Sequence, residues 1–109
     1  MLKRSERLNR QQFSELGRSG KRYHCDVATI SFTKHGHFHA AVVVSKKVSK
    51  SAVTRNTFRR RVYALLYQAK LAGQTGVFVV VVKPEAGAVS RAVFKEAILD
   101  LIGRIQKAA

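Results

Sequence analysis

The residues best suited to chemistry lie in one basic run. Of the sixteen residues from 46 to 61, seven are Lys or Arg and none is acidic. Arg binds phosphate oxygens through a planar fork of donors, and Lys binds them through a compact ammonium group. The run is therefore predicted to bind the phosphate groups of a partner.

The charge of the whole chain also indicates a polyanionic partner. No acidic residue lies between Asp26 and Glu85, whereas ten Lys and Arg residues do, and the 109 residues carry a net charge of +15. Solubility does not require so large a charge. The longest apolar run, residues 77–82, is too short to cross a bilayer, and the charged N-terminal residues do not match a secretory signal. We expect a cytoplasmic protein that binds nucleic acid and no membrane.

The acidic residues do not predict a nuclease site. A two-metal nuclease needs clustered carboxylates. The six acidic residues are widely spaced, and no pair has the spacing of a metal-binding motif: Glu6, Glu15, Asp26, Glu85, Glu96 and Asp100. A histidine-based ribonuclease is an alternative through His24, His35, His37 and His39, although no acid partner accompanies them. We therefore predict no catalytic residue in this chain.

The spacing of three histidines raises the question of a metal site. If they lay on a strand, His35, His37 and His39 would point the same way and could bind zinc or nickel, with Cys25 or His24 as a further ligand. Gly36 interrupts strand geometry, and no fourth ligand is fixed. We predict a turn that gains charge as the pH falls below about 6.5, rather than a metal site.

Six elements follow from the hydrophobic periodicity, in the order αββαβα. Helices are expected at residues 9–16, 52–71 and 90–106, and strands at 22–32, 38–45 and 77–82. A turn at residues 34–37 is expected to join the first two strands into a hairpin. Ser49 or Ser51 can cap the middle helix, and Gly73 or Gly76 can end it. The prediction is one α+β domain over residues 1–109, built as a two-layer sandwich.

The middle helix has a core side and a polar side. At about 100° per residue, the predicted core stripe is Phe58, Val62, Leu65 and Ala69. A second face gathers guanidinium groups, an amide and two phenol rings: Asn56, Arg59, Arg60, Tyr63 and Tyr67, with Lys70 among them and Arg55 at its border with the core. Arg binds phosphate and Tyr offers a platform for an unpaired base, so this face suits RNA. The alternative is a solvated basic helix whose Tyr rings only edge the core.

The same residues resemble the RNR-type region of the bacterial ribonuclease P protein subunit family. That family has a Ser-Lys-Lys segment, then Ala-Val-x-Arg-Asn, then a basic pair. In this chain the Ser-Lys-Lys segment is at residues 45–47, the Ala-Val-x-Arg-Asn segment is Ala52-Val53 with Arg55-Asn56, and the basic pair is Arg59-Arg60. The likeness covers essentially the full chain, including Arg7-Leu8 and Phe13 near its start. The resemblance implies a fold like domain 2 of ribosomal protein S5, with a left-handed strand-helix-strand crossover. Connections between parallel strands are otherwise almost always right-handed.

The resemblance also implies partners and a site. The RNR region would bind a catalytic RNA, and a cleft between the first helix and the sheet would receive the 5′ leader of precursor tRNA. Catalytic-RNA binding is then expected of Arg55, Asn56, Arg59, Arg60 and Tyr63, and leader binding of Phe13, Lys46, Lys47 and Lys50. Cleavage would belong to the RNA subunit, with Mg²⁺ held mainly by that RNA, and the protein would not be catalytic alone. No obligate protein partner is expected.

Three positions depart from the family pattern. Thr57 replaces the second Arg of the RNR triplet, Tyr63-Ala64 replaces an Arg-Glu pair, and Leu16-Gly17 stands where a second aromatic residue is usual. Two other functions share the basic surface. One is a ribosomal or general RNA-binding protein, and the other is a DNA-binding helix, for which no helix-turn-helix pattern is visible.

Overall fold

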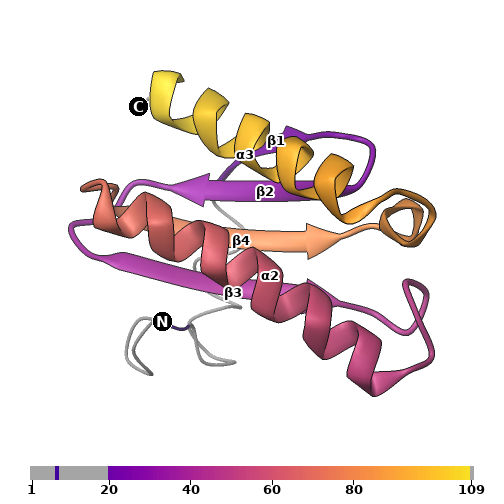
Figure 1. The fold of residues 1–109 in the computed structure, drawn as a ribbon. Helices are drawn as coiled ribbons and strands as arrows, with labels where there is room; N and C mark the ends of the chain where they lie inside the picture. Colours follow the sequence, from indigo (N-terminus) through magenta and orange to yellow (C-terminus); the bar gives the residue numbers. More distant parts are fainter. Residues whose placement is uncertain (1–6, 8–19, 109) are drawn as a thin grey trace.

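One four-stranded sheet carries two long helices on the same face (Figure 1). The computed structural model describes residues 7 and 20–108, so the helix expected at residues 9–16, with Phe13, lies outside the described residues. The elements are β1 (Lys21–His24), β2 (Ala28–Thr33), β3 (Phe38–Val44), α2 (Ala52–Leu71), β4 (Gly76–Val82), the short 3₁₀ helix η2 (Pro84–Ala88) and α3 (Arg91–Ala108). The predicted α+β class and its two layers are confirmed. Within residues 20–108, no helix has the length and apolar content that crossing a bilayer would require.

The strand order β1-β2-β4-β3 corrects the predicted hairpin. β4 lies between β2 and β3, antiparallel to β2 and parallel to β3. Strands 22–32 and 38–45 therefore do not pair with each other. The physical reason is that β4 is the most apolar strand, and all its residues except Val81 are buried, so it takes a central position with a neighbour on each edge.

The expected strand at residues 22–32 is two strands. Residues 25–27 form a tight turn in which the Cys25 amide donates to the Ala28 carbonyl at 3.0 Å, and β1 and β2 pair across it. The Val27 carbonyl accepts from the Lys83 amide at 2.8 Å, and the Lys83 ammonium donates to the Cys25 carbonyl at 2.7 Å. Because the end of β4 supplies these donors, the break depends on a contact distant in sequence.

The connection from β3 through α2 to β4 is left-handed. In Figure 1 both strands run from left to right, β4 lies above β3, and α2 crosses in front of them. This agrees with the crossover that the family resemblance implied, against the general preference for right-handed connections. The more specific likeness to domain 2 of ribosomal protein S5 stays a prediction.

The ends of α2 follow from local sequence. The Ser51 side chain accepts from the Thr54 amide at 3.3 Å, which satisfies one of the free donors at the start of the helix. Gly73 follows the helix with a φ of 93°, a left-handed conformation that glycine adopts readily. Gly76 begins β4 with a φ of 112°, and a Cβ atom there would lie 2.5 Å from the Phe32 ring. The predicted bounds of this helix, residues 52–71, are confirmed.

Both helices bury their predicted faces with one exception on α2. On α3, all five expected apolar residues are buried: Phe94, Ile98, Leu101, Ile102 and Ile105. On α2, Phe58, Val62 and Ala69 are buried as predicted, but Leu66 is fully buried and Leu65 only partly. The prediction for Leu65 was wrong because the sheet lies on the Leu66 side of the stripe, while Leu65 faces the groove between α2 and α3.

Candidate nucleic-acid interface

A basic hollow lies on the exposed side of the first half of α2. Its lining comprises Arg7, Asn56, Arg59, Arg60 and Tyr63, and its volume is about 270 Å³. We call it the α2 hollow. Four of the five residues predicted to bind the catalytic RNA are thus brought together. Among the residues that the structure describes, no acidic side chain lines the hollow, so its guanidinium groups and phenol ring are available to an anionic, aromatic ligand.

A hydrogen bond within the α2 hollow orients one guanidinium group. Nη1 of Arg59 donates to Oδ1 of Asn56 at 2.5 Å, one helical turn away. A guanidinium has five N–H donors, so this bond leaves most of them free for phosphate oxygens. Arg59 is half-buried and Arg60 is exposed. Asn56 therefore acts as a positioning residue for Arg59.

Arg7 enters the α2 hollow from a distant part of the chain. It forms an isolated parallel bridge with Ala40 of β3, which places it beside the outer edge of the sheet. Its guanidinium carbon lies 5.2 Å from the centroid of the Tyr63 ring, within cation–π range. The sequence pattern did not single out Arg7 as a site residue. Its role depends on a tertiary contact, and no motif spacing signals it.

Arg55, the fifth predicted residue, does not line the α2 hollow. Its Nη1 donates to the Ser49 carbonyl at 2.9 Å and to the Lys50 carbonyl at 3.0 Å. The guanidinium thereby ties the loop between β3 and α2 to the start of the helix. The structure gives Arg55 a positioning role, and direct RNA binding by this residue stays a prediction.

Three of the four residues predicted to bind the leader belong to the described part of the chain. Lys46, Lys47 and Lys50 are exposed in the loop between β3 and α2, the loop that Arg55 holds. None of them lines the α2 hollow. Phe13 lies outside the described residues, and so does the first helix that would form the expected cleft. The leader site therefore stays a prediction.

Thr57 shows how this chain departs from the family triplet. Its hydroxyl donates to the Val53 carbonyl at 3.0 Å, one turn earlier in α2. This back-bond turns the side chain towards the helix backbone. Thr57 is half-buried and does not line the α2 hollow, so it does not replace the missing Arg as a phosphate ligand.

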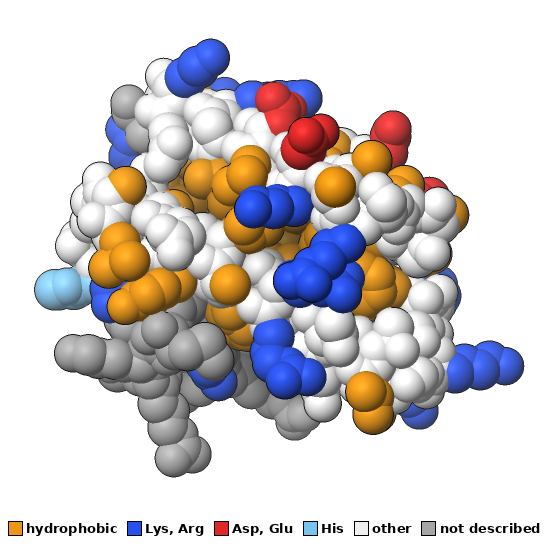
Figure 2. Space-filling view, viewed as in Figure 1, with side chains coloured by type: hydrophobic (Ala, Val, Ile, Leu, Met, Phe, Trp, Pro, Cys, Tyr) orange, Lys and Arg blue, Asp and Glu red, His pale blue; other side chains and the backbone are white. Residues whose placement is uncertain are grey.

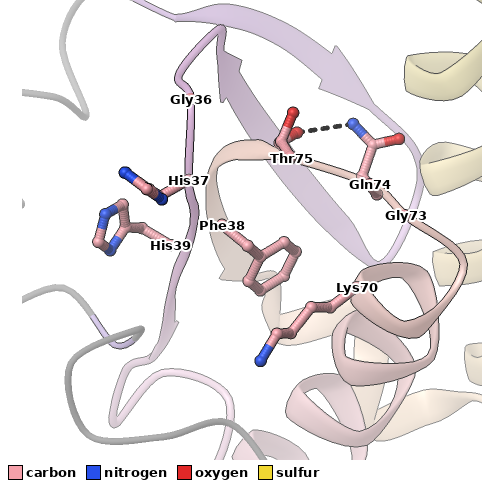
Figure 3. Close-up of a pocket in the computed structure, with 8 residues that line it drawn as sticks. All are labelled: Gly36, His37, Phe38, His39, Lys70, Gly73, Gln74 and Thr75. Carbon is pink, nitrogen blue, oxygen red and sulfur yellow. Dashed lines mark hydrogen bonds between the residues drawn. The ribbon is translucent and has the colours of Figure 1, made fainter.

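The histidine-rich turn borders a second hollow at the far end of α2 (Figure 3). His37 and His39 lie on one side of it, and Phe38 and Lys70 lie on the other. Nδ1 of His35 accepts from the His37 amide at 3.1 Å, and Nδ1 of His39 is buried without a hydrogen-bond partner among the described residues. Among the described residues, no three His, Cys, Asp or Glu side chains are placed to hold a metal ion.

Comparisons with known proteins agree on one family. The family model described as Ribonuclease P matches residues 2–106. The "Ribonuclease P protein component" of Pseudanabaena sp. (strain PCC 6903) is 34% identical over 85 residues, which are 74% of this chain and 73% of that relative. The ribonuclease P protein of Thermotoga maritima is 25% identical, with a TM-score of 0.78 over 91% of this chain and 96% of that one. The Staphylococcus aureus protein, at 16% identity and a TM-score of 0.83, covers 92% and 94% and shows the shared fold alone.

Proposed function

This chain belongs to the ribonuclease P protein family, and from that premise we propose that it is the protein subunit of a tRNA-processing ribonucleoprotein. With a catalytic RNA, the subunit assists the endonucleolytic removal of 5′ leaders from precursor tRNAs. A ribosomal or general RNA-binding protein without a role in cleavage is not favoured by the family match.

The observation that carries this proposal is the composition of the α2 hollow. Arg59 and Arg60 offer guanidinium donors to phosphates, and Tyr63 offers a ring to an unpaired base, with no carboxylate of residues 20–108 lining the same surface. Each cation that neutralises a phosphate releases counterions, which adds to affinity and makes it fall with salt. We propose that this surface binds the catalytic RNA.

The protein contributes charge neutralisation to the reaction. The catalytic RNA and the precursor tRNA are both polyanions and repel each other. A chain with a net charge of +15 reduces that repulsion where it lies between them. We propose that Lys46, Lys47 and Lys50 extend this effect to the leader, with Phe13 as the aromatic contact.

The carboxylates within residues 20–108 do not fit a Mg²⁺ site. Asp100 pairs with Arg104 at 2.7 Å, and the described acidic residues form no cluster with other metal-binding side chains. Mg²⁺ needs several oxygen ligands in near-octahedral geometry. We therefore propose that the ions are held mainly by the RNA subunit, where they would stabilise charge at the cleaved phosphate. A cytoplasmic location stays a prediction.

Reconstitution at low Mg²⁺ tests the proposed function. A bacterial ribonuclease P RNA and labelled precursor tRNA are incubated with the protein, without it, and with the protein but without the RNA. Cleavage at the mature 5′ end should require the RNA and rise sharply with the protein. No stimulation with a cognate RNA would leave a general RNA-binding protein, and cleavage by the protein alone would contradict the assignment of catalysis to the RNA.

A further inference from the structure

Another basic hollow lies in the groove between α2 and α3, apart from both the α2 hollow and the hollow beside the histidine-rich turn. Three cations surround a partly apolar floor, and no acidic residue of the described part of the chain lines it. The lining residues are Arg61, Ala64, Leu65, Arg91, Phe94 and Lys95. We call it the interhelical groove. On the helix-covered side of the molecule, Figure 2 shows Lys and Arg side chains standing against hydrophobic ones, while acidic side chains gather along the upper edge.

The three cations of the interhelical groove have no partner in the described part of the chain. Arg61, Arg91 and Lys95 make no hydrogen bond or ion pair there, in contrast to Arg104, which pairs with Asp100 at 2.7 Å. Arg91 and Lys95 are also four residues apart on α3, a spacing at which like charges destabilise a helix. An anionic ligand would remove this repulsion.

The position of Arg91 raises the positive potential further. It lies in the first turn of α3, which contains no acidic residue. The start of a helix carries a partial positive charge and ordinarily favours Asp or Glu there. Cationic residues at this end therefore act against the stability of the free helix and in favour of an anion bound beside it.

The floor of the interhelical groove can accept the face of a base. Leu65 is half-buried and Ala64 is exposed, and the buried Phe94 also lines the groove, with its ring centroid 5.2 Å from that of Phe58. The volume is about 190 Å³. Pockets for larger organic ligands span roughly 300–1,000 Å³, so this hollow suits a single planar group with charged neighbours. A nucleotide has that combination.

The interhelical groove and the α2 hollow lie on different sides of one helix. Two residues along a helix correspond to a rotation of about 200°, so Arg61 points about 160° away from Arg59. A phosphate bound by Arg59 cannot also contact Arg61. The two surfaces would therefore bind separate stretches of RNA.

We propose that the interhelical groove is a second RNA site that takes single-stranded RNA. One base would lie on the floor formed by Ala64 and Leu65, and the flanking phosphates would bind Arg61 and Arg91. A second copy of this chain is disfavoured as the occupant because each copy carries a net charge of +15. The inference goes beyond the proposed function and does not rest on it.

Binding of a labelled, short single-stranded oligouridine to the full chain tests this site. A background of Arg59→Ala/Arg60→Ala with Lys46→Ala/Lys47→Ala/Lys50→Ala removes cations from both the α2 hollow and the predicted leader site, and Arg61→Gln/Arg91→Gln is then added to it. Affinity should fall about tenfold for the lost charge-assisted contacts. The slope of log affinity against log salt should shrink by about 1.4, since each phosphate contact on a single strand contributes about 0.7.

A charge-matched control separates a site from general attraction. Lys34→Gln/Lys107→Gln in the same background removes two exposed charges elsewhere and should change affinity less than twofold. Ala64→Glu, at an exposed position on the floor, should weaken binding without unfolding the chain.

Four results would overturn the proposal. The first is an equal loss in the groove and control variants, and the second is no oligouridine binding in the background variant. The third is a duplex RNA whose affinity falls as much as that of oligouridine when Arg61 and Arg91 are replaced. The fourth is polyglutamate binding more tightly than oligouridine, which would indicate an acidic protein partner. None of these readouts uses the catalytic RNA, so a failed reconstitution and a failed groove test remain distinguishable.

Discussion

Removing the guanidinium of Arg59 should weaken binding of the catalytic RNA while leaving the fold intact. Arg59 lines the α2 hollow, and among the described residues it donates one hydrogen bond, to Oδ1 of Asn56. Arg59→Ala therefore removes charge-assisted contacts worth about 1 to 2 kcal/mol, which is roughly a five- to thirtyfold loss of affinity. The amide oxygen left behind can bind water because Asn56 is exposed, so the free energy of unfolding should change by less than about 0.5 kcal/mol.

The assay is a titration of labelled catalytic RNA with wild-type and variant protein at several salt concentrations. Each lost phosphate contact should reduce the salt slope by about 1. Arg60→Ala should behave similarly, because Arg60 lines the same hollow and is exposed. Arg104→Ala is the matched control, since it removes the same charge from a residue already paired with Asp100 on α3.

Two results would refute this reasoning. Unchanged affinity in both Arg59→Ala and Arg60→Ala would show that the α2 hollow does not bind the catalytic RNA. An equal loss in Arg104→Ala would show that net charge, and not the placement of these side chains, determines affinity. A thermal denaturation curve for each variant confirms that it is folded before affinities are compared.

Three further predictions concern stability, measured as the free energy of unfolding in urea. Arg55→Ala should lower it by about 1 to 2 kcal/mol because two loop carbonyls lose their donor, and no change would remove the positioning role. Gly76→Ala should lower it by about 1 to 3 kcal/mol because of its positive φ and close neighbour, whereas Gly36→Ala, with open space around the new Cβ, should be nearly neutral. Leu66→Ala should cost about 2 to 5 kcal/mol and Leu65→Ala clearly less, and equal losses would contradict the burial difference.

The two long helices α2 and α3 were the most predictable part of the fold. A Ser at the start of α2 and a Gly after its end mark its bounds through local hydrogen bonds and backbone freedom, which depend only on nearby residues. The buried face of α3 follows from its spacing alone. Leu65 and Leu66 could not be separated in this way, since both border the apolar stripe and only the placement of the sheet and α3 decides between them.

The order of the strands could not be read from local patterns. A turn between two apolar segments favours a hairpin, and the segment at residues 38–45 satisfied that rule. β4 nevertheless pairs with both β2 and β3, because burying its continuous Val run is worth more than a short connection. The competing partner comes more than thirty residues later in the chain, as the paired Val79 and Ala41 show, so no window around the turn contains it.

The candidate site was predictable where it lies on one helix. Asn56, Arg59, Arg60 and Tyr63 share a face by helical geometry, and the structure gathers them in one hollow. Arg55 sits near the same face, yet its guanidinium is directed to the preceding loop, a choice that depends on where the loop carbonyls lie. Rotation angles give a residue's direction from the axis but not its hydrogen-bond partner.

Arg7 offers the sharpest test of what the structure adds to the sequence. Its bridge to Ala40 and its position over the Tyr63 ring place its charge in the α2 hollow. Arg7→Ala should therefore weaken binding of the catalytic RNA about fivefold, as expected for one exposed charge-assisted contact of about 1 kcal/mol. Arg22→Ala is the control, since β1 and β3 are opposite edges of the sheet and Arg22 is exposed on β1.

Tyr63 should couple to this effect. An exposed cation–π contact is worth about 0.5 to 1 kcal/mol, and the contact with Tyr63 holds the Arg7 guanidinium in the position from which it would bind RNA. In a Tyr63→Leu background the loss from Arg7→Ala should shrink by roughly twofold, because the cation is no longer held over a ring. If Arg7→Ala and Arg22→Ala lose equal affinity in the wild-type background, Arg7 contributes only net charge. The α2 hollow would then be a surface of α2 alone, as the sequence first predicted.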